Sequence, residues 1–133
     1  MNTGIMRPIV FISAERHNKS ELANQFATEA MREIINRRNI GYRIVEGVYK
    51  MIPEVTFVLP APSEDYIDQW LELASDFNQE CILYRNAEGT AFLVYPNGDR
   101  EKLGQLEQVT KEEAFSAGSY TYDPINETYW SVK

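Results

Sequence analysis

The stretch from Glu46 to Leu59 constrains the fold most, because it holds two strand-like apolar segments around a break at Gly47 and Pro53. A tight hairpin turn usually carries Asn-Gly or Asp-Gly, so this Pro-containing break predicts a wider connection between two strands. Tyr49 and Glu54 lie at the break. They are the first candidates for a functional site. The alternative is a surface connection with an incidental glutamate.

The rest of the chain alternates between strand and helix patterns. Short apolar runs predict strands at 8–13, 40–45, 55–59, 81–84 and 90–95. Apolar residues recur at helical spacing in 22–35 and 66–77, and the predicted N-caps of these helices are Asn18 and Ser63. A final hairpin is predicted from 119–122 and 128–132, whereas 104–114 is interpreted as irregular or as a short helix.

The order of these elements predicts an α+β fold of the ferredoxin-like (βαββαβ) type. Such a fold packs two helices on one face of an antiparallel sheet, and here it would carry extra C-terminal strands. A chain of 133 residues with 44% apolar content is expected to form a single domain over 1–133. The other face of the sheet then needs cover from the extra strands or from another subunit.

Composition and charge limit the partners and the compartment. The net charge of −7, from 20 acidic and 13 basic residues, disfavours nucleic acid and weakly favours a cationic ligand, although a solvated acidic surface that aids solubility is the simpler explanation. No apolar run approaches the ~20 residues of a membrane span. The single cysteine, Cys81, and the lack of a leader pattern in the first eight residues predict a cytoplasmic protein.

Several catalytic chemistries lack their residues in this sequence. His17 is the only histidine and no Gly-x-Ser-x-Gly motif accompanies it, which disfavours a Ser-His-Asp hydrolase. No Cys/His spacing indicates a metal site and no glycine-rich motif indicates a phosphate cradle, so neither metal nor cofactor is predicted. Cys81 lies in an apolar run and is interpreted as a structural thiol.

Two further segments are candidates for ligand binding. In the first, residues 11–16, the small residues Ser13 and Ala14 lie at the end of the first predicted strand, where they allow a ligand to approach backbone amides, although an ordinary strand-to-helix loop is the simpler alternative. Gln79 and Glu80 precede the strand at 81–84. The sequence leaves open whether these segments meet within one subunit or only between subunits.

At these residues the chain resembles the phage-encoded S-adenosylmethionine lyases, a family formerly called S-adenosylmethionine hydrolases. The similarity extends from about Val10 to Trp130 and depends on the order and spacing of short pieces. These pieces are Ile12-Ser13-Ala14, Val48-Tyr49, Pro53-Glu54-Val55-Thr56, Gln79-Glu80-Cys81-Ile82-Leu83-Tyr84 and Leu93-Val94-Tyr95.

The resemblance implies cleavage of S-adenosylmethionine to 5′-methylthioadenosine and L-homoserine lactone, by attack of the substrate's own carboxylate and without metal or cofactor. It also implies a homo-oligomer, expected to be a trimer with sites between subunits. A phage enzyme of this kind would deplete the methyl donor of host methylation and restriction in the host cytoplasm. The matched positions make Glu54 and Tyr49 catalytic. The implied substrate-binding residues are Ser13, Ala14, Val48, Gln79 and Glu80.

The charge change in such a reaction determines what Glu54 can do. A carboxylate about 4 Å from the sulfonium would attract it by roughly 4 kcal/mol at an effective dielectric of about 20. That attraction disappears as the sulfonium charge is neutralised, so it would favour binding and oppose the chemical step. We therefore expect Glu54 to contact the α-ammonium or the ribose hydroxyls. Tyr49 is expected to bound the pocket, and the backbone at Ser13 and Ala14 to take the adenine or the amino-acid end.

Two other functions compete with this interpretation. One is a non-catalytic acidic module that mimics nucleic acid and thereby inhibits restriction enzymes, but the basic residues are scattered among the acidic ones and no long acidic run exists. The other is a regulatory domain that binds a small molecule without converting it.

Overall fold

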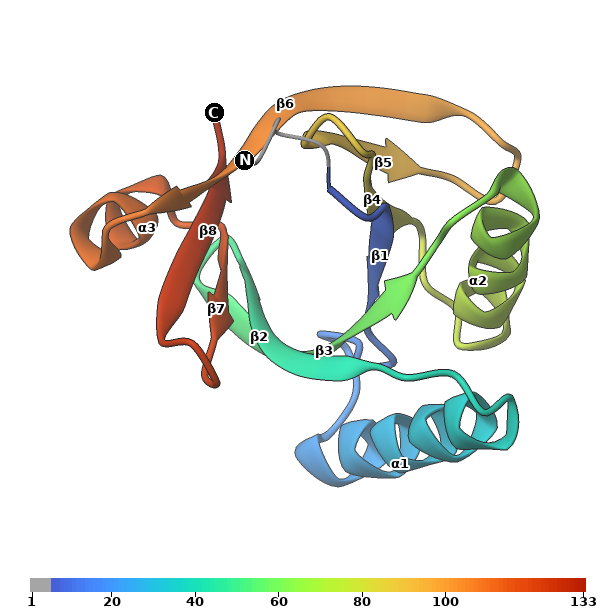
Figure 1. Ribbon diagram of the computed structural model, residues 1–133. Coiled ribbons are helices and arrows are strands. Elements are labelled where there is room, and N and C mark those ends of the chain that lie inside the picture. Colours follow the sequence, from blue (N-terminus) through green and yellow to red (C-terminus); the bar gives the residue numbers. More distant parts are fainter. Residues whose placement is uncertain (1–5) are drawn as a thin grey trace.

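The computed structural model describes residues 6–133, and within them the chain forms a closed antiparallel barrel of eight strands with helices outside it (Figure 1). The strand order is β1-β3-β2-β7-β8-β6-β5-β4, and β1 pairs with β4 to close the ring. Residues 1–5, which begin the segment without a leader pattern, lie outside the described residues.

The elements have the following bounds. The strands are β1 (Ile9–Ile12), β2 (Arg43–Tyr49), β3 (Ile52–Pro60), β4 (Ile82–Arg85), β5 (Thr90–Val94), β6 (Arg100–Val109), β7 (Tyr120–Asp123) and β8 (Thr128–Val132). The helices are α1 (Glu21–Arg37), α2 (Glu64–Asp76) and α3 (Lys111–Ala117). Ser20, not the predicted Asn18, caps α1 by accepting a hydrogen bond from the amide of Ala23.

The predicted ferredoxin-like fold is wrong, because the sheet is closed instead of open. The predicted order of the first six elements is present, and β4-β1-β3-β2 are antiparallel neighbours. However, β7 continues the sheet beyond β2, β5 continues it beyond β4, and β6 and β8 join these two extensions. The missing element in the prediction was β6, whose polar sequence hides the strand pattern.

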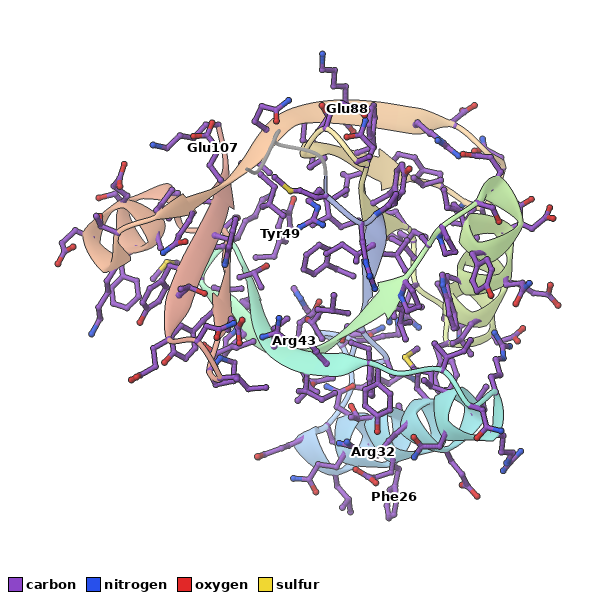
Figure 2. All side chains as sticks on the ribbon, viewed as in Figure 1. Phe26, Arg32, Arg43, Tyr49, Glu88 and Glu107 are labelled. Atoms are coloured by element: carbon purple, nitrogen blue, oxygen red, sulfur yellow. The ribbon has the colours of Figure 1, made fainter. Side chains whose placement is uncertain are left out.

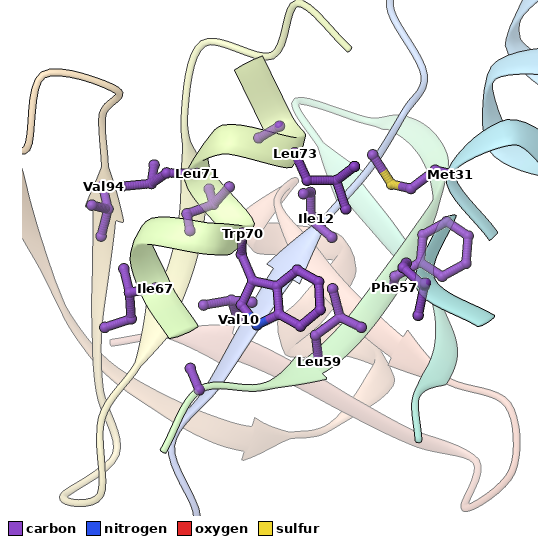
Figure 3. Close-up of a cluster of buried hydrophobic side chains, with 14 of the residues drawn as sticks. Val10, Ile12, Met31, Phe57, Leu59, Ile67, Trp70, Leu71, Leu73 and Val94 are labelled. Carbon is purple, nitrogen blue, oxygen red and sulfur yellow. The ribbon is translucent and has the colours of Figure 1, made fainter. Parts of the chain in front are cut away.

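The hydrophobic core lies between the barrel wall and helices α1 and α2 (Figure 3). Alternation along β1 and β3 directs Val10, Ile12, Phe57 and Leu59 toward the helices, where all four are buried. Trp70 of α2 packs against this face, and its indole N–H donates to the carbonyl oxygen of Pro60 at 2.8 Å. This packing fixes β3 against β1 and thereby positions the residues that precede Phe57 along β3.

Candidate functional site

The break within 46–59 is a two-residue hairpin turn, so the predicted wider connection is wrong. Lys50 and Met51 form the turn with φ values of +48° and +69°, a conformation that usually selects Asn or Gly. Contacts from outside the hairpin stabilise it. The amide of Lys50 donates to the hydroxyl of Ser119 at 3.1 Å, and the amide of Met51 donates to the carbonyl of Gly118 at 2.9 Å. The connection between α3 and β7 therefore holds this turn.

The β2–β3 ladder continues through the break, where Gly47 pairs with Glu54 and Val48 pairs with Pro53. A Cβ atom at Gly47 would lie 2.5 Å from the Thr56 hydroxyl oxygen and 3.9 Å from Cγ of Glu54. Gly47 thus leaves room for these two side chains. Strand alternation places Val48 on the opposite face from Glu54, so a binding role for the Val48 side chain remains a prediction.

Antiparallel pairing brings the other candidate segments to the same end of the barrel. The end of β1 lies beside the start of β3 and the start of β4, because Ile12 pairs with Phe57 and Phe11 pairs with Leu83. The residues after β1 (13–15), those before β4 (79–81) and the start of β3 therefore surround one mouth of the barrel. Tyr49, at the end of β2, is exposed at this mouth.

Glu15, which lies in the candidate segment 11–16 but was given no role from the sequence, connects these segments within one subunit. Its carboxylate accepts a hydrogen bond from the amide of Val55 at 2.8 Å. Its own amide donates to the hydroxyl of Ser13 at 3.1 Å, and its carbonyl accepts from the side-chain amide of Gln79 at 3.0 Å. The signal for Glu15 was present as a carboxylate directly after the small residues that end β1.

The remaining predicted residues differ in their exposure. Ala14 is buried and belongs to the hydrophobic core, so any contact with a ligand would use its backbone. Glu80 is exposed beside Cys81 at the mouth. Burial, followed by the nearby carboxylates of Glu80, Glu101 and Glu54, raises the pKa of the Cys81 thiol. A protonated thiol at neutral pH agrees with the structural role predicted for Cys81.

Glu54 is the carboxylate whose protonation the site changes most clearly. Partial burial raises its pKa from 4.5 to about 7, and the negative charge of Glu15 contributes to the rise. The carboxyl group is therefore close to half protonated at neutral pH. A bound cation would favour its ionised form, and an ionised Glu54 would favour the cation in return.

A cleft of about 670 Å³ lies between α1, the loop after β1 and the start of β3. Its lining combines acidic and basic side chains. They include Glu15, Arg16, Asn24, Thr28, Arg32 and Glu54. A cleft of this size with charges of both signs suits a small ligand that itself carries both charges.

Residues 10–133 match the model of the S-Adenosylmethionine lyase family, which covers nearly the whole chain. The chain belongs to the S-adenosylmethionine lyase family. The match confirms the resemblance found in the sequence, and at the level of the family it indicates a lyase that acts on S-adenosylmethionine. A search of curated proteins found no match. Within residues 6–133, no helix combines the length and the apolar character that crossing a membrane requires.

Proposed function

We propose that this member of the family cleaves S-adenosylmethionine to 5′-methylthioadenosine and L-homoserine lactone. The observation that carries the proposal is the family match over residues 10–133. The geometry supports it with the partly buried carboxyl group of Glu54 at the mouth of the barrel, where residues 52–55 help to line a cleft of mixed charge. S-adenosylmethionine fits such a cleft, because its amino-acid end carries an ammonium and a carboxylate next to the sulfonium.

The reaction needs no nucleophile from the protein. A carboxylate oxygen of the substrate forms a bond to the γ-carbon of the same molecule, and the bond between that carbon and the sulfur breaks. The electron pair of the broken bond goes to the sulfur, which becomes a neutral thioether. The negative and positive charges cancel, and no proton is transferred. The protein contributes by holding the attacking oxygen in line with the carbon–sulfur bond, which removes much of the entropic cost of the folded conformer.

In this proposal Glu54 binds the α-ammonium of the substrate. Its raised pKa shows that ionisation is unfavourable in the free site, so an arriving cation restores a favourable charge balance. Tyr49, on the same face of the β2–β3 hairpin, bounds the pocket with its ring or its hydroxyl. An alternative partner for Glu54 is the ribose diol, which would still fix the conformer without stabilising the sulfonium.

The other predicted residues have supporting roles in the proposal. Gln79 and Ser13 hold the backbone of Glu15, so they position the wall of the cleft. Ala14 would offer its backbone, Glu80 would add negative charge at the mouth, and Val48 would act through its backbone, since its side chain is on the other face. We further propose a homotrimer with sites between subunits, acting in the host cytoplasm to deplete the methyl donor of restriction and methylation systems.

A product assay tests the proposed function. Purified protein is incubated with S-adenosylmethionine in ¹⁸O-labelled water, and the products are separated by chromatography and identified by mass. We expect 5′-methylthioadenosine together with unlabelled homoserine lactone. Homoserine that carries the label from the start would indicate hydrolysis. Binding without turnover would favour a regulatory module, and inhibition of a restriction enzyme in the absence of S-adenosylmethionine would favour an acidic decoy.

A further inference from the structure

Thr28 of α1 is a buried polar residue whose hydroxyl makes no hydrogen bond with the described residues. The residue is 6% exposed, and among the described residues its Oγ1 atom has no hydrogen-bond partner. Other buried threonines are satisfied: the Thr90 hydroxyl bonds to the side-chain amide of Gln105 at 2.9 Å, and that of Thr56 donates to the carbonyl of Glu54 at 3.3 Å. An unpaired buried hydroxyl lowers stability, so its presence calls for an explanation.

The position of Thr28 explains the unpaired hydroxyl, because the residue lines the same cleft as Glu54. Asn24 lies one helical turn before it and binds the backbone of Arg16 on both sides, accepting from its amide at 2.9 Å and donating to its carbonyl at 3.0 Å. Arg32 lies one turn after it, with its guanidinium 5.8 Å from the ring centre of Phe57. Figure 2 shows Phe26, by contrast, pointing away from the barrel.

The charged residues of the cleft are unevenly distributed between its two sides. On the β3 side, Glu54 lies next to Val55, whose amide binds the carboxylate of Glu15. On the α1 side, Arg16 and Arg32 flank the position of Thr28. Arg32 is paired with Glu29 at 3.3 Å, whereas Arg16 takes part in none of the ion pairs found within residues 6–133. Lys19 also lies on the α1 side, together with the carboxylates of Glu21 and Glu29, so basic residues exceed acidic ones there by a small margin. This side therefore favours an anionic group, whereas Glu54 on the β3 side favours a cationic one.

We infer that the Thr28 hydroxyl is a substrate-binding group, which donates a hydrogen bond to the carboxylate at the amino-acid end of the substrate while Glu54 binds the α-ammonium. The inference rests on the proposed function. The Oγ1 atom has less than 1 Å² of exposed surface, so binding requires rotation about χ1 between the two rotamers that helical threonine populates.

A neutral donor suits this position. It can hold one carboxylate oxygen and leave the other free to attack the γ-carbon. A guanidinium bonded directly to the carboxylate would stabilise a charge that disappears in the transition state, and it would oppose the reaction. In this arrangement Arg16 contributes through the local potential, and Thr28 makes the contact.

The first test compares the stability of two matched variants. Thr28→Val removes the hydroxyl and keeps the shape of the side chain, and Thr90→Val does the same at a buried threonine that is hydrogen-bonded. We expect Thr90→Val to lower the Tm and Thr28→Val to leave it unchanged or raise it. A Tm loss for Thr28→Val as large as that for Thr90→Val would show a bonded structural hydroxyl and would overturn the inference.

The second test measures binding by calorimetry with two probes. S-adenosylhomocysteine carries the amino-acid end, and 5′-methylthioadenosine lacks it. We expect Thr28→Val to weaken S-adenosylhomocysteine binding about tenfold and to leave 5′-methylthioadenosine binding unchanged, whereas Thr28→Ser recovers the affinity. Unchanged binding of both probes would overturn the inference, and so would equal weakening of both, which would place the contact on the nucleoside.

The two proposals can fail separately. If the wild-type protein cleaves S-adenosylmethionine and Thr28→Val has wild-type kcat/KM and probe affinities, the inference about Thr28 fails and the proposed function stands. If the wild-type protein binds S-adenosylhomocysteine without cleaving S-adenosylmethionine, the proposed function fails, and the difference between the two probes still decides the role of Thr28.

Discussion

The two halves of β3 have opposite surroundings although one ladder with β2 holds them both. In the C-terminal half, Phe57 and Leu59 lie between the barrel and the helices and are 0% exposed. In the N-terminal half, Ile52 is 43% exposed, and Glu54 lies at the mouth of the barrel with a raised pKa. The packed half therefore fixes where the exposed half stands, and a carboxylate can be kept in an unfavourable place because the neighbouring residues stabilise the strand.

The largest expected effect is on the packed half. Phe57→Ala removes a fully buried ring and is expected to lower the free energy of unfolding by about 3–5 kcal/mol, with activity lost as the protein unfolds. Urea denaturation followed by circular dichroism measures the change. Phe26→Ala is the control, since Phe26 is 67% exposed and should change stability by less than about 0.5 kcal/mol. Similar values for the two variants would contradict the difference in packing.

A substitution in the exposed half of β3 is expected to lower activity and to raise stability. Glu54→Gln should lower kcat/KM about 100-fold, because it removes the ionic contact with the substrate. It should also stabilise the protein at pH 8. The folded-state pKa of about 7 lies above the model value of 4.5, so the contribution of Glu54 to stability is full below pH 4.5 and is lost as the pH rises through 7.

At pH 8, Glu54→Gln is expected to raise the free energy of unfolding by on the order of 1 kcal/mol, allowing for solvent screening of the partly exposed group. Thermal melts of both proteins between pH 4 and pH 8 check it. The Tm difference should appear between pH 4.5 and 7. A variant that is inactive and less stable at pH 8 would mean that Glu54 supports the fold instead of straining it.

Gly47→Ala tests how the packed half of β3 positions the exposed half. The added Cβ would lie 2.5 Å from the hydroxyl of buried Thr56, so either β2 or Thr56 must move. We expect a stability loss of about 1–2 kcal/mol and a fall in kcat/KM of about tenfold, because Glu54 moves with the strand. Gly41→Ala is the matched control, since its Cβ would have no atom within 4 Å. Equal effects of the two changes would show that this close approach does not matter.

The smallest predicted effect is on the pH profile. For the wild-type protein kcat/KM should rise with pH through about 7 and then level, because ionised Glu54 binds the substrate. In Glu15→Gln the midpoint should move to lower pH, as one negative charge is lost, yet remain above 4.5 because burial is the larger cause. The glutamine oxygen can still accept from the amide of Val55. Glu33→Gln on the exposed surface of α1 should leave the midpoint unchanged.

Local patterns in the sequence predicted both long helices and most strands, since these elements bury a regular apolar face. They did not predict the closed ring. β6 contains Arg100, Glu101, Lys102 and Glu107, and its pairing depends on partners far along the chain. With β6 interpreted as irregular, nothing joined β5 to β8, and the sheet remained open.

The candidate site, too, was predicted only in part from the sequence. Ser13, Gln79 and Glu54 lie at ends of elements, where a change of pattern is visible in the sequence, and the structure places them at one mouth of the barrel. Glu15 directly follows the small residues at the end of β1, but its role, like that of Thr28, became apparent only from contacts between segments: the bond from Val55 to Glu15, and the missing bond at Thr28. The turn at Lys50 was mispredicted because the groups that stabilise it are 69 residues away at Ser119.

Closure of the ring also limits how copies of the chain can assemble. An open sheet ends in strands whose free N–H and C=O groups can recruit a strand from another molecule. Here each of the eight strands in the described residues already has two neighbours. A second copy must therefore be recognised through side chains, among which Met51 at the β2–β3 turn and Phe115 on α3 are large, apolar and exposed. In the proposed oligomer, substitutions at these two residues would alter assembly while leaving the hydrogen-bond ladder intact.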